Sequence, residues 1–141
     1  MSQPQQTARE YAYISITGPG THEVITERLG MKPTEAWNVG DIDERNGRPR
    51  KFMAWHLRNG LDDTHPLEQH IAELLLIFHA TPEATRALWV EYELTLQCVG
   101  YYPYSRGPGA HFNREVIRQA AQYGFSIDCD FYFSEDHGHD G

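Results

Sequence analysis

One short pattern of residues occurs twice in this chain, once on each side of a long amphipathic segment. The first copy has Gly18-Pro19-Gly20 and then a helix-like stretch that ends at Gly30, and the second has Gly107-Pro108-Gly109 and a similar stretch that ends at Gly124. Segments with the alternation typical of β-strands flank each copy. The repetition predicts two half-copies of a strand–helix–strand unit, and it limits the possible folds more than any other feature.

The segment between the two copies predicts one long helix. Over residues 66–80 the apolar side chains recur at the spacing of a helix with one buried face. These side chains are Leu67, Ile71, Leu74, Leu75 and Phe78. Asp63 or Thr64 is placed to cap this helix, and Pro66 suits its first turn. The helix therefore joins the two half-copies.

Alternating apolar and polar residues predict four strands, at residues 11–17, 51–57, 92–99 and 125–133. Shorter helices are expected over residues 22–29, for a turn or two from Pro82, and from Asn113, as the cap, to about Gln122. Residues 31–50 contain many turn-forming residues and end in a basic cluster. We interpret them as a solvated loop.

Two strand–helix–strand units with short crossovers join most simply into one sheet. We expect an α+β fold: a ferredoxin-like four-stranded antiparallel sheet in the order 4-1-3-2, with both crossover helices on one face. The central helix is then inserted between the second and third strands, and it docks either at the edge of the sheet or across its open face. In that order the first strand separates Cys98 from Cys129 by about 9.5 Å, beyond the roughly 7 Å that a disulfide spans. Both thiols should be free.

The size and charge of the chain limit its class. Its 141 residues suit one domain, and we expect a frayed segment at 1–10, a single α+β domain at 11–133 and a polar tail at 134–141. A net charge of −8 opposes binding to nucleic acid and favours a basic protein partner. The polar start and the lack of a long apolar run predict no secretory signal and no membrane partner, so the cytoplasm is the expected location.

Residues spread along the chain are similar to a known family. Leu29-Gly30-Met31-Lys32-Pro33-Thr34 is followed by Trp37, Gly40-Asp41, Trp55 and Ile127-Asp128. In order and spacing these residues resemble the bacterial domain-of-unknown-function family 4279, over about residues 11–133. The resemblance implies a small α+β domain without an established activity, so it assigns no catalytic residue to this chain.

The expected sheet gathers polar and aromatic side chains on the face away from the crossover helices. The binding residues that we predict there are Tyr11, Tyr13, Gln97, Asp128, Asp130 and Tyr132. Asp128 and Asp130 lie two residues apart on one strand, roughly 6.5 to 7 Å apart at the backbone. That spacing suits a general acid and base, two cation ligands or a hydrogen-bonded polar surface. Tyrosines on such a face stack bases in some RNA-binding domains, but the aspartates beside them repel phosphates.

Motifs for cofactors, metals and nucleophiles are missing from the sequence. The Gly-Pro-Gly turns lack the residues of nucleotide-binding loops, and the histidines, including His137 and His139 in the tail, form no recognised ligand pattern. We therefore predict no cofactor, no metal and no catalytic residue. The expected function is a non-enzymatic acidic interaction domain, of which an immunity-type protein that neutralises a toxin is one form. The alternatives are a small-molecule-binding or hydrolytic enzyme that uses Asp128 and Asp130, and a subunit of a homo-oligomer.

Overall fold

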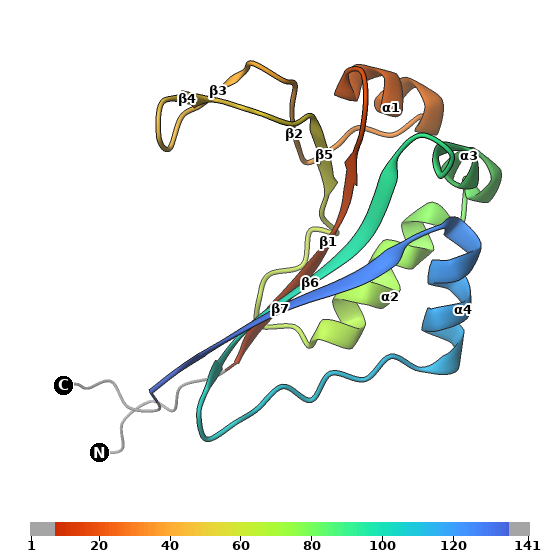
Figure 1. Cartoon of the computed structure of the whole chain (residues 1–141). Helices are drawn as coiled ribbons and strands as arrows, with labels where there is room; N and C mark the ends of the chain where they lie inside the picture. Colours follow the sequence, from red (N-terminus) through yellow and green to blue (C-terminus); the bar gives the residue numbers. More distant parts are fainter. Residues whose placement is uncertain (1–7, 136–141) are drawn as a thin grey trace.

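The computed structural model describes residues 8–135, and Figure 1 shows its elements. The strands are β1 (Arg9–Thr17), β2 (Glu35–Trp37), β3 (Ile42–Asp43), β4 (Arg48–Pro49), β5 (Ala54–Leu57), β6 (Glu93–Pro103) and β7 (Ser126–Ser134). The helices are α1 (His22–Leu29), α2 (Leu67–Phe78), α3 (Pro82–Leu88) and α4 (Arg114–Tyr123). Residues 1–7 and 136–141, which hold most of the expected frayed start and polar tail, lie outside the described residues.

Five strands form one mixed sheet in the order β2-β5-β1-β6-β7. β1 lies in its middle and runs antiparallel to both β5 and β6, so that Ile14 has Leu57 on one side and Leu96 on the other. β2 runs antiparallel to β5, and β7 runs parallel to β6. β3 and β4 pair with each other in a separate hairpin.

The described helices all lie on one face of this sheet, which we call the covered face (Figure 1). Alternate residues of a strand point to the same side, and those on the covered face are apolar. Ile14, Ile16, Trp55 and Leu96 have no exposed surface. Trp55 also donates a hydrogen bond from Nε1 to Thr26 Oγ1 at 3.0 Å, which ties α1 to the sheet.

The expected ferredoxin-like sheet is wrong in strand number, order and direction. Its four-stranded antiparallel 4-1-3-2 order places the last strand beside the first, but β7 pairs with β6 and runs parallel to it. In the first half of the chain, β2 and the β3–β4 hairpin lie between α1 and β5, and β5 returns antiparallel beside β1. In the second half, α4 connects the parallel neighbours β6 and β7. Parallel strands need a crossover connection of this kind. The two half-copies therefore fold into units of different topology.

Helix α2 docks at neither of the places that we expected. It joins the helical layer, where it packs against β1 and β6 and beside α4 (Figure 1). Its beginning also differs, because the N-cap residue is Pro66 and no side chain of that residue caps the helix. Instead the N–H of Leu67 donates to Glu10 Oε1 of β1 at 3.0 Å. A strand residue distant in sequence therefore holds the start of α2.

The second carboxylate oxygen of Glu10, on β1, fixes the position of the Tyr102 side chain on the neighbouring strand β6. Tyr102 Oη donates to Glu10 Oε2 at 2.6 Å. The ring of Tyr102 lies over Gly100, where an added Cβ would be 2.2 Å from Tyr102 Oη. Burial and then the bond to Glu10 raise the pKa of the Tyr102 phenol. Position 100 therefore accepts no larger side chain unless this ring moves.

Cys98 and Cys129 are free, as predicted, but the predicted reason is wrong. They are direct partners on the neighbouring strands β6 and β7, and β1 does not lie between them. Cys98 is buried and Cys129 is exposed. Burial raises the pKa of both thiols, so both are protonated at neutral pH and weakly nucleophilic.

Candidate functional site

The face of the sheet opposite the helices, which we call the open face, carries the polar and aromatic positions of the strands. The register forms the cross-strand rows Tyr13–Gln97–Asp128, Tyr11–Val99–Asp130 and Arg9–Tyr101–Tyr132. The structure therefore brings all the binding residues predicted from the sequence onto one face. Their part in binding stays a prediction.

Aromatic rings cross the open face from β7 to β2. The ring-centroid distances are 5.1 Å for Tyr132–Tyr101, 6.3 Å for Tyr11–Tyr13, 4.8 Å for Tyr13–His56 and 5.1 Å for His56–Trp37. Rings at such distances attract one another in stacked or edge-to-face arrangements. Trp37 joins this group only because β2 pairs with β5, and the sequence did not predict β2.

Arginine side chains lie over several of these rings. The guanidinium carbon is 3.7 Å from the ring centroid in Arg50–Trp37, 4.7 Å in Arg58–Tyr11 and 4.9 Å in Arg9–Tyr101. A cation at such a distance is attracted by the face of the ring. Sequence reasoning missed these contacts, although the basic cluster that ends at Lys51 was a signal for Arg50.

The carboxylates of β7 lie at the edge of the open face. Gln97 is buried, and its Nε2 donates to Asp130 Oδ2 at 2.8 Å and to the backbone oxygen of Asp128 at 3.4 Å. The carboxylate of Asp130 is therefore already engaged within the sheet. The hydrogen bond from Gln97 to Asp130 is typical of a polar sheet surface whose side chains bind one another.

Burial shifts the pKa values of three side chains on the open face, Tyr11, Tyr13 and His56. It raises the pKa of Tyr13, with Tyr11 adding to the effect, and it raises the pKa of Tyr11 together with Tyr101. Burial also lowers the pKa of His56, although Glu35, with Oε1 4.0 Å from His56 Nδ1, opposes that shift. At neutral pH the face thus presents neutral phenols and a neutral imidazole. These neutral groups can pack against a partner and form hydrogen bonds with it.

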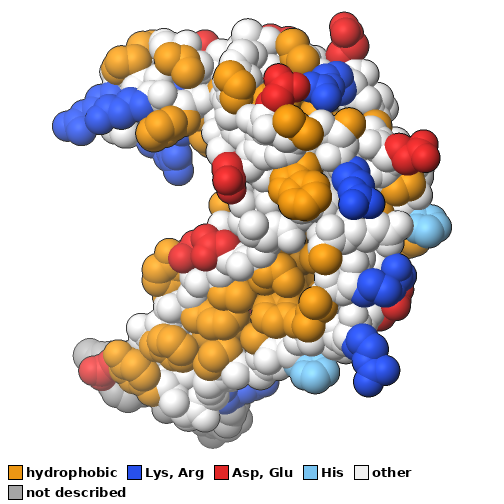
Figure 2. Space-filling view, turned by 45° about the vertical axis from the view of Figure 1, so that its right-hand side comes forward, with side chains coloured by type: hydrophobic (Ala, Val, Ile, Leu, Met, Phe, Trp, Pro, Cys, Tyr) orange, Lys and Arg blue, Asp and Glu red, His pale blue; other side chains and the backbone are white. Residues whose placement is uncertain are grey.

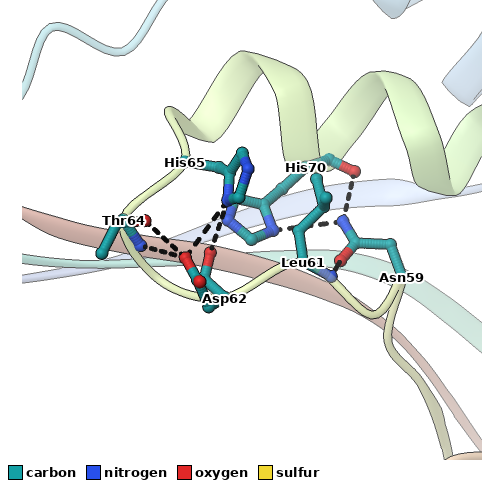
Figure 3. A network of polar contacts seen from close by, with 6 residues as sticks. All are labelled: Asn59, Leu61, Asp62, Thr64, His65 and His70. Carbon is teal, nitrogen blue, oxygen red and sulfur yellow. Dashed lines mark hydrogen bonds and ion pairs between the residues drawn. The ribbon is translucent and has the colours of Figure 1, made fainter.

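A second polar cluster lies between β5 and α2, outside the open face (Figure 3). Asn59 Nδ2 donates to the backbone oxygen of His70 at 3.0 Å and lies 3.1 Å from His70 Nδ1. Asp62 Oδ1 accepts from the N–H of Thr64 at 3.0 Å and lies 3.2 Å from His65 Nδ1. The network fixes the loop before α2. Within residues 8–135 no three His, Cys, Asp or Glu side chains meet in a way that could hold a metal ion.

Shallow cavities on the described surface include the three that follow. A groove of about 510 Å³ lies between the sheet and the β3–β4 hairpin, one of about 460 Å³ lies at the start of β6, and one of about 480 Å³ lies between α2 and α4. Neither Asp128 nor Asp130 lines any of these cavities. The pair that could have served an enzyme therefore lies outside them.

The fold and this face define a class: a small α+β domain whose mixed five-stranded sheet is covered by helices on one side. The chain belongs to the family described as domain of unknown function DUF4279, whose model matches residues 7–134. Comparisons with curated proteins and with solved structures found no match. No helix within residues 8–135 is long and apolar enough to cross a membrane.

Proposed function

We propose that this protein is a non-enzymatic interaction domain whose open face binds another protein. The observation that carries this proposal is the group of aromatic rings and stacked arginines on that face, which we call the open-face cluster. It consists of Arg9, Tyr11, Tyr13, Trp37, Arg50, His56, Arg58, Tyr101 and Tyr132. Tyrosine, tryptophan and arginine are the residues that contribute most to the free energy of protein association.

Charge is divided across the open face. Asp128 and Asp130 lie on β7 at one side, whereas Arg50 and Arg58 lie toward β2 and β5 at the other. The acidic side, in a chain of net charge −8, favours basic groups on a partner. An immunity-type protein that neutralises a basic toxin is one form of this function.

The contacts of the aspartates favour interaction over the enzyme alternative. Asp130 accepts a hydrogen bond from Gln97, and both aspartates lie outside the cavities described above. His56 on β5 is separated from the aspartates of β7 by the strands β1 and β6, so it is not placed to act together with them. A general base must lie within hydrogen-bond reach of the proton that it abstracts, and small-molecule substrates are usually bound in a cleft.

Self-association is a second candidate, favoured by apolar surface. Apolar side chains gather over the lower half of the view in Figure 2. In the described part of the chain, Ile117 is 53 % exposed and Phe133 is 45 % exposed. β7, which carries Phe133, is an edge strand of the described sheet, and edge strands can pair with another chain. Size-exclusion chromatography at micromolar concentration tests this candidate, because a strict monomer would contradict it.

The interaction proposal is tested by co-purification with matched variants. The wild-type chain, the double variant Tyr13→Ala/Tyr132→Ala and the control Tyr104→Ala serve as baits in native lysate, and bound proteins are quantified by mass spectrometry. Tyr104 is a suitable control because it is 66 % exposed, against 51 % for Tyr132, and belongs to no ring pair of the cluster.

We expect one protein to be recovered equally by wild type and the Tyr104 variant, and at least about tenfold less by the double variant. Equal recovery by all three baits, or no enriched protein with wild type, would contradict the proposal.

A further inference from the structure

The β3–β4 hairpin extends away from the five-stranded sheet (Figure 1). An open groove lies between the hairpin and the sheet. This groove, the hairpin groove, has a volume of about 510 Å³. The lining residues that matter for its chemistry are Trp37, Asp43, Arg48, Arg50, Lys51 and Phe52. Lys and Arg side chains project from the hairpin lobe at the upper left of Figure 2. The groove therefore combines aromatic walls with positive charge.

One wall of the hairpin groove is held in place by an ion pair and a stacked ring. The Arg50 guanidinium lies 3.7 Å from the centroid of Trp37, and Arg50 Nη1 is 3.4 Å from Asp43 Oδ2. Asp43 is buried, and its Oδ1 also accepts from the N–H of Arg45 at 3.0 Å. Only 18 % of the Arg50 side chain is exposed. Arg50 therefore keeps one position, and a ligand would not have to order it.

The groove has an excess of positive charge in an acidic protein. Asp43 is the acidic residue among those that line it, and Asp43 already pairs with Arg50 and Arg45. Arg48 and Lys51 are exposed and contribute further positive charge. Although the whole chain has a net charge of −8, the hairpin groove is therefore locally positive.

Exposed apolar side chains adjoin this positive charge. Phe52 is 72 % exposed and lines both the hairpin groove and the neighbouring cavity at the start of β6. In that second cavity Val39, Trp89 and Val90 are 64 %, 57 % and 89 % exposed. Large apolar side chains grouped on a surface mark contact sites, and those beside arginines are common in protein interfaces.

We propose that the hairpin groove binds an acidic segment of a protein partner that carries an apolar or aromatic side chain. Carboxylates of the segment meet Arg48 and Lys51, and its apolar side chain packs against Phe52 and Trp37. This inference rests on the proposed function and adds the chemical class of the partner at this end of the molecule. Nucleic acid is disfavoured because an extended row of phosphates would also approach the acidic remainder of the chain.

The test selects binders from a phage library of random peptides with the full chain as target, and measures the affinity of the selected peptides by fluorescence anisotropy. We expect selection of peptides rich in Asp and Glu that also contain Phe, Trp or Leu. The double variant Arg48→Glu/Lys51→Glu should weaken their binding at least about tenfold, and Phe52→Ala at least about threefold. The control Arg106→Glu/Arg114→Glu makes the same change of charge at exposed positions away from the groove. It should change affinity less than about twofold.

The outcomes separate this inference from the proposed function. Selection of basic peptides would overturn the proposal that the hairpin groove binds an acidic segment. So would a control variant that weakens peptide binding as much as the hairpin variant does. So would peptides that respond to Tyr13→Ala/Tyr132→Ala but not to the hairpin variants, although that result would support the open face as a binding surface. Anionic phosphatidylserine vesicles and an oligothymidylate are tested in parallel. Binding of either that is tighter than that of the peptides, and lost in the hairpin variant, would also overturn the inference.

Discussion

The covered and open faces are made by the same strands, yet the side chains of the two faces differ in how far they are buried. On β1, Ile14 and Ile16 of the covered face are fully buried, whereas Tyr11 and Tyr13 of the open face stay partly exposed. Complete burial of an isoleucine side chain stabilises a fold by about 1.5–3 kcal/mol, and an aromatic pair adds about 0.5–1.5 kcal/mol. The covered face therefore holds the molecule together, while the open face can lose a ring at a smaller cost to folding.

Two tryptophan substitutions should separate the faces most strongly. Trp55→Ala removes a fully buried ring and its hydrogen bond to Thr26, and should lower the free energy of unfolding by about 3–5 kcal/mol. Trp37→Ala on the open face should lower it by less than about 2 kcal/mol. Urea denaturation followed by circular dichroism measures both values. Equal losses would remove the distinction between the faces.

A glycine on the covered face should show the next largest effect. Gly100→Ala places a methyl group against the Tyr102 ring, and we expect a loss of about 1–3 kcal/mol in the free energy of unfolding. Gly109→Ala is the control, because nothing lies within 4 Å of a Cβ added there. The same denaturation experiment applies. A Gly100 variant as stable as the control would show that the Tyr102 ring moves aside freely.

Acid should lower the free energy of unfolding mainly through His70, a buried histidine of α2. Burial lowers the pKa of His70, which is 1 % exposed and whose Nδ1 lies beside the Asn59 amide. The unfolded chain then binds more protons than the native one below the ordinary histidine pKa of about 6.5. Stability is therefore complete above that pH and falls as the pH decreases toward the lowered pKa. Thermal melts from pH 8 to pH 5 should show this decline, and His70→Gln should flatten it.

The open-face histidine provides the comparison for that experiment. Burial lowers the pKa of His56 too, and nearby carboxylates oppose the shift at both histidines. The His56 side chain is 19 % exposed, whereas His70 is 1 % exposed, so protonation of His56 costs less. His56→Gln should therefore flatten the pH dependence less than His70→Gln does. The reverse order would mean that the open face, rather than the core, limits stability in acid.

The smallest contrast is in thiol reactivity on the covered face and needs no substitution. Cys129 is exposed and should react slowly with a disulfide reagent in the native protein, whereas the buried Cys98 should react only after unfolding. Spectrophotometric titration with and without urea measures this difference. Equal native rates would contradict the pairing of β6 and β7 that encloses Cys98.

Local patterns in the sequence predicted the four described helices and the long strands, but not how they assemble. Alternation along β1, β6 and β7 correctly placed Tyr13, Gln97 and Asp128 on one face, because side-chain direction is a local property of a strand. The order of strands was not predictable in this way, because β7 pairs with β6 instead of β1, and because β2, β3 and β4 lie in the segment interpreted as a loop. Its strands β3 and β4 are two residues each, too short for an alternating pattern to show.

Contacts between distant residues were not predictable from local patterns. Glu10 holds the first N–H of α2 from 57 positions away, and Arg50 stacks on Trp37 only because the hairpin returns beside β2. The candidate site was therefore predicted on its β1, β6 and β7 side. Its arginines and its β2 and β5 side required the structure.

The most direct test of this account compares stability and binding in one variant. Tyr13→Ala/Tyr132→Ala should reduce the free energy of unfolding by less than about 2 kcal/mol, measured by urea denaturation, while partner recovery falls at least about tenfold. A loss of stability as large as that of Trp55→Ala, or unchanged recovery in a stable variant, would contradict the claim that the open face serves binding rather than folding.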